Sequence, residues 1–238
     1  MFTISPYFVL ASTSIILLVK DLNNIYFDFF FKSLLIINVC DIFLIYTLGF
    51  KARWYQLHSL INLIITYRTF NETLSFFINP LQSVKVIEYN FDQFLIINLH
   101  FYHFLTFNNL TTMDYFHHIV FVLFGVFPIS YYFKYNLVSI FYFTGCGFTG
   151  FLEYGMLTLV KNNYIEKINQ KKYTKFLYNF LRYPLSIYSC SLTWIHNQNG
   201  TLIYCSSSLI FYLILISFSN SAIFNILTIE SYYKSIGY

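Results

Sequence analysis

The sequence predicts an all-α protein, a polytopic bundle of transmembrane helices with about seven spans. Three observations favour this fold class. Of the 238 residues, 57% are hydrophobic and only 10% are charged, whereas soluble domains carry roughly 25% charged residues. The apolar residues fall in runs close to the ~20 residues that a helix needs to cross a bilayer. Lys and Arg collect in alternate connections between these runs, as they do in multi-pass membrane proteins.

Seven apolar runs are candidate spans. In chain order they cover roughly 4–19, 33–50, 55–70, 93–108, 115–133, 137–160 and 201–219. The first has no basic flank of the kind found in signal peptides, so it is expected to remain as a span. A further apolar segment, 184–196, begins at Pro184 and is expected to form a short re-entrant or interfacial piece.

The distribution of basic residues predicts the orientation of the chain. The longest polar stretch, 161–182, holds six Lys and Arg residues against one Glu, and it is expected to be a solvated cytoplasmic loop near anionic lipid headgroups. Alternation of the spans then places Lys51 and Arg53 in the cytoplasm, with Arg53 and Trp54 as interfacial anchors. The sequon at Asn71 would lie on the opposite, lumenal side, where a glycan would exclude an origin in an organelle matrix.

The chain is expected to form one membrane unit. Residues 1–49 would hold the N-terminal spans, 50–220 the main transmembrane domain and 221–238 a short C-terminal tail. The net charge of +4 is small and dispersed, which argues against nucleic-acid binding. The four cysteines show no CxxC spacing, so neither a zinc site nor a disulfide framework is indicated. Membrane lipids are the expected partners, no cofactor or metal is expected, and the oligomeric state is left open.

The stretch MDYFHHIVFVLFG places three polar residues at the start of an apolar run. On a helix, Asp114 lies three and four residues before His117 and His118, so the three side chains share one flank. A carboxylate near an imidazole can orient the ring, as it does for a catalytic base. This pattern makes His117, His118 and Asp114 candidate catalytic residues. The alternative is that Asp114 only caps the helix while the histidines meet water at the interface.

Other polar residues fall inside the expected spans, where they usually face the bundle interior and mark functional sites. His58 and Asn62 are one turn apart in the third span, and His100 and His103 lie three apart in the fourth. Glu153 lies in the glycine-rich sixth span, where a carboxylate is costly unless it is protonated or paired, for example with an imidazole. These five residues are expected to face the bundle interior and to line a common polar cavity there.

The spacings HxxH and DxxHH also resemble the histidine boxes of membrane di-iron oxidases. Such sites need many imidazoles, and this chain has six histidines in all. A site for a single metal ion from His100, His103, His117 and Asp114 is chemically allowed, although the spacing does not require it. A metal-dependent lipid oxidase is therefore one alternative, and a structural or transport subunit without enzymatic activity is another.

The histidine motifs resemble the TLC family, which includes ceramide synthases, translocation-associated membrane proteins and lipid-regulating homologues. The similar segments are RWYQLHSLIN, with His58, Ser59 and Asn62, and DYFHHIV, with Asp114 and the histidine pair. Glu153 in GFLEY falls where such proteins carry an acidic residue. The resemblance extends over roughly residues 50–220.

The resemblance implies about six core helices around a cavity open to lipid, with one extra span, in the endoplasmic reticulum or another endomembrane. In ceramide synthases the paired histidines catalyse acyl transfer from acyl-CoA to a sphingoid amine, so His117 or His118 would be the base or transient acyl acceptor. Those enzymes carry two acidic residues in the span after the histidines, whereas this chain offers only Glu153. The departure favours a homologue concerned with lipid sensing, homeostasis or metabolism over an acyltransferase.

Overall fold

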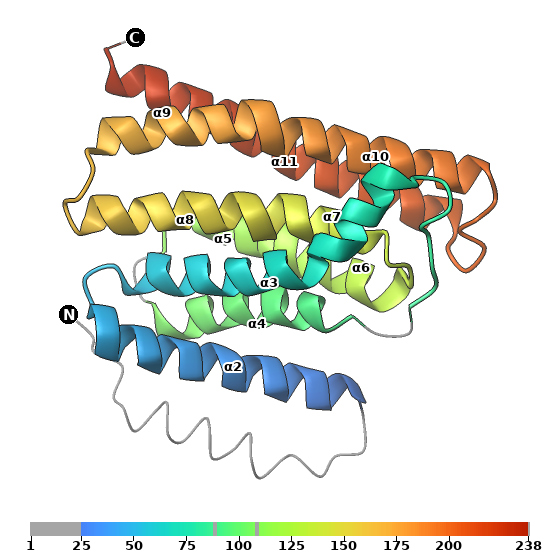
Figure 1. The fold of residues 1–238 in the computed structure, drawn as a ribbon, viewed down its shortest axis with the longest axis horizontal. Helices are drawn as coiled ribbons and strands as arrows, with labels where there is room; N and C mark the ends of the chain where they lie inside the picture. Colours follow the sequence, from blue (N-terminus) through green and yellow to red (C-terminus); the bar gives the residue numbers. More distant parts are fainter. Residues whose placement is uncertain (1–24, 88–89, 108–109, 238) are drawn as a thin grey trace.

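The chain folds into a bundle of helices, most of which lie along one long axis (Figure 1). The structure is a computed structural model and describes residues 25–87, 90–107 and 110–237. These residues contain no β-strand, and their one β-like pairing is an isolated bridge between Val86 and Tyr135. The all-α class expected from the sequence is therefore confirmed for the described residues. The first expected span, 4–19, lies outside them.

The helices include three π-helical segments, η1 to η3, each of which continues directly from an α-helix into the next. In chain order the elements are α2 (Ile25–Leu48), α3 (Arg53–Ile78), α4 (Phe91–Thr106), α5 (Thr112–Phe116), η1 (His117–Val126), α6 (Phe127–Tyr132), α7 (Val138–Tyr142), η2 (Phe143–Gly147), α8 (Phe148–Lys161), α9 (Lys167–Leu177), η3 (Tyr178–Arg182), α10 (Tyr183–Gln198) and α11 (Ser207–Ser235).

Helix α3 lies in the middle of the bundle and packs against α8, α2 and α4. Its inward face carries Leu57, Ile61 and Ile65, all with no exposed surface. In Figure 1, α2 lies on one side of this centre, while α10 and α11 pack together on the other side. A central position suits α3 because polar residues such as His58 and Asn62 are buried on it together with the apolar ones, away from the outer surface.

The outer surface of the bundle is rich in large apolar side chains. Tyr46, Phe124, Phe127 and Phe211, on four different elements, are each more than half exposed. Contiguous exposed apolar surface of this kind marks a face that meets membrane or protein. Among the described residues, three helical stretches are long and apolar enough to cross a membrane, namely Phe27–Leu48, Thr112–Ile129 and Ser207–Ser235. A membrane protein is thus supported at this coarser level.

Two segments differ from the sequence-based prediction because helix continues where a loop or tail was expected. The stretch 161–182 is not a loop, since α9 and η3 run from Lys167 to Arg182 and join α10 without a break. Pro184 therefore does not start a short separate segment, because it lies in the first turn of α10 within this longer helix. Residues 221–238 do not form a tail either, since α11 continues as far as Ser235.

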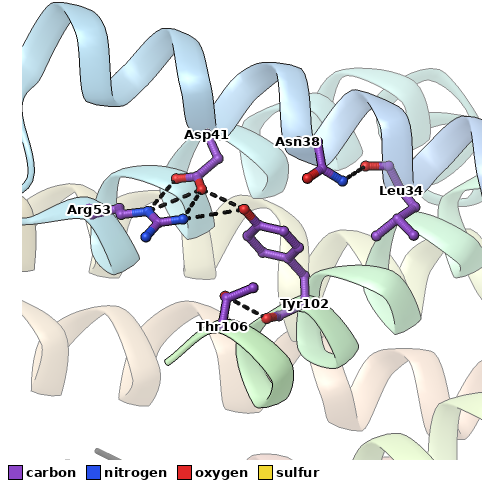
Figure 2. Close-up of polar contacts among 6 residues, drawn as sticks. All are labelled: Leu34, Asn38, Asp41, Arg53, Tyr102 and Thr106. Atoms are coloured by element: carbon purple, nitrogen blue, oxygen red, sulfur yellow. Dashed lines mark hydrogen bonds and ion pairs between the residues drawn. The ribbon is translucent and has the colours of Figure 1, made fainter. Parts of the chain in front are cut away.

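A buried ion pair joins α2, α3 and α4 (Figure 2). The Nε of Arg53 donates to both carboxylate oxygens of Asp41, at 2.9 and 3.0 Å, and Nη2 contacts the same carboxylate. The hydroxyl of Tyr102 on α4 donates to Asp41 at 2.6 Å. All three residues are buried. The prediction of Arg53 as an interfacial anchor was wrong, because a buried carboxylate on α2 requires this partner.

Candidate functional site

A cavity of about 130 Å³ lies inside the bundle, between α3, α4, α8, α11 and the three π-helical segments. All eight residues that the sequence suggested as catalytic or cavity-lining contribute to its wall. The complete lining is Trp54, His58, Asn62, His100, His103, Met113, Asp114, His117, His118, Gly145, Cys146, Gly150, Glu153, Tyr154, Tyr178, Arg182 and Phe224. The sixth histidine, His196, lies elsewhere and bonds Thr201 and the Pro80 carbonyl.

The two histidine motifs face each other across the cavity as two pairs. The Nε2 atoms of His117 and His100 are 3.3 Å apart, and the Nε2 of His118 is 3.2 Å from the Nδ1 of His103. On α4 the residues of HxxH are three apart, and on the facing helix the histidines are adjacent at the start of η1. The pairing therefore joins α4 to η1 through four imidazoles.

One hydrogen bond outside the cluster fixes the roles of the nitrogens in the first pair. The Nδ1 of His100 is 2.7 Å from the carbonyl oxygen of Ile96, which can only accept, so Nδ1 carries the proton. The Nε2 of a neutral His100 is then an acceptor, and His117 must donate to it from its own Nε2. This arrangement leaves the Nδ1 of His117 with a free lone pair.

Three buried ring nitrogens of the cluster have no hydrogen-bond partner among the residues that the structure describes. They are Nε2 of His58, Nδ1 of His117 and Nδ1 of His118. Buried polar groups are nearly always paired, so each is available to a bound molecule. His58 is additionally held by aromatic neighbours, since its ring stacks on Tyr154 at 4.3 Å between ring centres and packs edge-on against Trp54.

Asp114 bonds the start of its own helix, and none of the hydrogen bonds among the described residues joins it to an imidazole. Its Oδ2 accepts from the backbone N–H and the hydroxyl of Thr111, both at 2.7 Å. The Thr111 side chain in turn accepts from the backbone N–H of Asp114, which completes a capping box. The cap itself is thus Thr111, with Asp114 in the third helical position. The prediction that Asp114 takes part in capping the helix is therefore confirmed, whereas its orientation of the imidazoles stays a prediction.

Glu153 is paired, as the sequence analysis allowed, but its partner is a tyrosine and not an imidazole. The hydroxyl of Tyr178 donates to its Oε2 at 2.5 Å. Arg182, one turn further along η3, donates from Nη1 to the same hydroxyl oxygen. Its guanidinium also lies over the ring of Tyr178, with 4.5 Å from Cζ to the ring centre. These three residues form a polar chain along one side of the cavity.

Sequence reasoning missed Tyr178 and Arg182 as site residues because it treated their segment as a loop. Their separation by four residues was the available signal, since that spacing puts two side chains on one face of a helix. Cys146 was seen as a small apolar residue but also lines the cavity. All four cysteines of the chain are free thiols.

The three π-helical segments share one property, because each contributes cavity-lining residues. His117 and His118 begin η1, Gly145 and Cys146 lie in η2, and Tyr178 and Arg182 are the two ends of η3. A π turn widens the helix locally and is frequently found at functional sites. The coincidence of all three with one cavity supports this cavity as the candidate site.

The sequence allowed a site for a single metal ion. The described residues contain no group of three or more His, Cys, Asp or Glu side chains arranged to hold one.

Comparison of the chain with protein-family models, with curated proteins and with solved structures gives no match. The candidate function is accordingly argued from the cavity itself.

Proposed function

We propose that the chain is a multi-pass membrane protein of TLC type, with about seven spans in an endomembrane such as the endoplasmic reticulum, and that it acts on or senses a membrane lipid in the histidine cavity. One observation carries the proposal. Five histidines and Glu153, from helices far apart in the sequence, line a single cavity inside a bundle whose outer face is apolar.

The cost of this arrangement supports a functional role. Ionisable side chains in an apolar bundle are expensive to bury and are typically kept where a polar ligand is handled. Burying an unpaired polar group costs about 1–3 kcal/mol, and the cluster has three such nitrogens. A lipid headgroup with donors or acceptors would satisfy them while its acyl chains stay in the surrounding apolar environment.

Acyl transfer is a second candidate, and the hydrogen bond of His100 to Ile96 favours it. That bond leaves the Nδ1 of His117 with a lone pair and no partner. A buried imidazole nitrogen of this kind can take a proton from a hydroxyl or amine or accept an acyl group. His117 is the better-defined catalytic candidate of the pair, because the tautomer of His118 is not fixed by a bond outside the cluster.

Lipid profiling tests the proposal. Cells that express the protein should differ in lipid composition from cells without the gene, and His117→Gln with His118→Gln should abolish the difference. The glutamines keep polar side chains in the cavity but supply no basic nitrogen. A loss confined to His117→Gln, with normal protein levels, would favour acyl transfer, whereas equal loss from either single variant would favour lipid binding without catalysis.

His196→Gln is the control for the loss of a buried histidine. His196 is fully buried and both of its nitrogens have partners outside the cavity, so this variant should be less stable but keep the lipid profile of the wild type at equal protein level. A double variant at His117 and His118 that still changes lipid composition as the wild type does would contradict the proposal.

A further inference from the structure

The guanidinium of Arg182 is buried with unused hydrogen-bonding capacity. The residue is only 6% exposed. Arginine has five N–H donors, of which Nη1 bonds the Tyr178 hydroxyl, while the buried Nε has no partner. Among the ion pairs of the described residues, none includes Arg182. A buried positive charge is costly unless it is paired with an anion, so this group lacks the partner that its burial requires.

Glu153 is near enough to act on the charge of Arg182 but does not contact the guanidinium directly. Its carboxylate accepts from the Tyr178 hydroxyl, so Tyr178 stands between the acid and the guanidinium. The aromatic rings of Tyr178 and Phe224 cover Arg182, with Cζ at 4.5 and 5.6 Å from the ring centres. The two rings restrict the orientation of the planar guanidinium. Arg182 itself is one of the residues that line the cavity.

The histidine cluster lies next to this guanidinium. The ring of His117 meets the ring of Phe224 edge to face at 5.3 Å between centres, and Arg182 lies over the same Phe224. One wall of the cavity therefore places a fixed positive charge beside the histidine cluster.

We propose that this wall is a subsite for a phosphate oxyanion, in which the Nε edge of Arg182 is the principal donor. The proposal rests on the lipid function proposed above and specifies its ligand as a phosphate-bearing lipid. Guanidinium matches the geometry of phosphate oxygens and binds them with charge-assisted hydrogen bonds. The cavity volume of about 130 Å³ is on the order of four water molecules at ~30 Å³ each, which is enough for one such group.

Binding by the purified full-length protein in detergent tests the subsite. The probes are inorganic phosphate, a short-chain phosphatidic acid, and the diacylglycerol of the same chain length, which lacks phosphate. Titration calorimetry should show binding of the phosphatidic acid and at least tenfold weaker binding of the diacylglycerol. If inorganic phosphate binds as tightly as phosphatidic acid, the ligand is a free phosphate and not a lipid. If neither inorganic phosphate nor phosphatidic acid binds, the subsite itself is wrong.

Substitutions locate the site. Arg182→Gln should weaken phosphatidic acid binding at least tenfold, and Arg182→Lys should lie between it and the wild type, because lysine keeps the charge but loses the planar fork. Glu153→Gln should tighten binding at least twofold, since it removes a nearby negative charge. A merely structural role for Arg182 predicts no such gain. Lys161→Gln, which removes an exposed positive charge, is the control and should bind as the wild type.

The outcomes separate this inference from the function on which it rests. If Arg182→Gln and the wild type bind phosphatidic acid equally, the subsite is wrong even where the double histidine variant still loses the lipid phenotype. If Arg182→Gln does not fold, two other variants decide the matter. Phosphatidic acid should bind more weakly to Arg182→Lys than to the wild type and more tightly to Glu153→Gln. Equal binding by those two variants overturns the inference.

Discussion

Asn62 and Gly150 fit each other closely at the wall of the cavity. A Cβ at Gly150 would lie 2.5 Å from the Nδ2 and 3.2 Å from the Cγ of Asn62, which is closer than non-bonded atoms approach. Gly145, in the adjacent η2, is also a lining residue but has nothing within 4 Å of such a Cβ. A glycine is therefore required at position 150 by a particular neighbour, whereas position 145 has room for a side chain.

This difference predicts opposite effects of two alanine substitutions. Overpacking costs typically 1–3 kcal/mol, while Gly to Ala in an open helical position gains up to about 1 kcal/mol. Gly150→Ala should therefore unfold at a lower temperature than the wild type in the same detergent, and Gly145→Ala at an equal or higher temperature. Adding Asn62→Ala to Gly150→Ala should restore part of the loss. Equal midpoints for the two single variants would show that Asn62 moves aside freely.

At the scale of single residues, the sequence predicted which polar side chains face the interior but not what they bond. His58, His100 and Glu153 were identified because polar groups in apolar runs turn away from lipid. Their partners depend on how separate helices pack, which local spacing does not encode. For Glu153, imidazoles were the example of a partner, and Tyr178 was not considered because it lay in a segment expected to be a loop.

At the scale of elements, the ion pair of Arg53 with Asp41 holds α2 and α3 together and involves α4 through Tyr102. Removing one member of a buried pair leaves the other charge unpaired, which costs about 3–5 kcal/mol. Arg53→Met should therefore lower the unfolding midpoint strongly, and Lys51→Met, at an exposed position two residues earlier, should leave it unchanged. The measurement is thermal unfolding of the purified variants.

A second substitution distinguishes charge from packing in this result. Asp41→Asn combined with Arg53→Met removes both charges, so the double variant should be more stable than Arg53→Met alone. If the double variant is the less stable of the two, an unpaired charge on Asp41 is not what destabilises Arg53→Met, and the explanation by charge pairing is wrong.

The helices themselves were predicted well where apolar runs define them and poorly where polar residues continue a helix. Helix α3 extends past the expected end at residue 70 to Ile78, because Thr73 and Phe76 still face the interior. Helix α9 was expected to be a loop because its composition is polar. It is instead held against α11, where Lys171 donates to the carbonyl of Ser231 at 2.9 Å and Lys175 lies over the Tyr232 ring.

At the scale of the whole molecule, α9, η3 and α10 form one continuous helix, and its length decides whether the connections before and after it lie at opposite ends of the bundle. Residues 167–198 at 1.5 Å per residue span about 48 Å, which exceeds the ~30 Å hydrocarbon core of a bilayer. Lys161, just before this helix, and Gln198, at its end, would therefore lie on opposite sides of a membrane. Both positions are exposed.

Single cysteines at these positions test the orientation. In a background with the four native cysteines replaced, Lys161→Cys should react with a membrane-impermeant maleimide only from the cytoplasmic side, and Gln198→Cys only from the other side. The expectation follows from the Lys-rich composition around position 161. Reaction of both cysteines from one side would show that α9–α10 does not cross.

The cavity is not midway along the bundle. His58 lies five residues after the start of α3, His103 three before the end of α4, and Glu153 eight before the end of α8. These helix ends meet at the side that carries Lys51 and Lys161. With that side in the cytoplasm, the polar groups would lie level with a single leaflet. On the lipid function proposed above, the protein would then respond to the lipids of the cytoplasmic leaflet alone, and a change confined to the opposite leaflet would reach it only after those lipids had flipped.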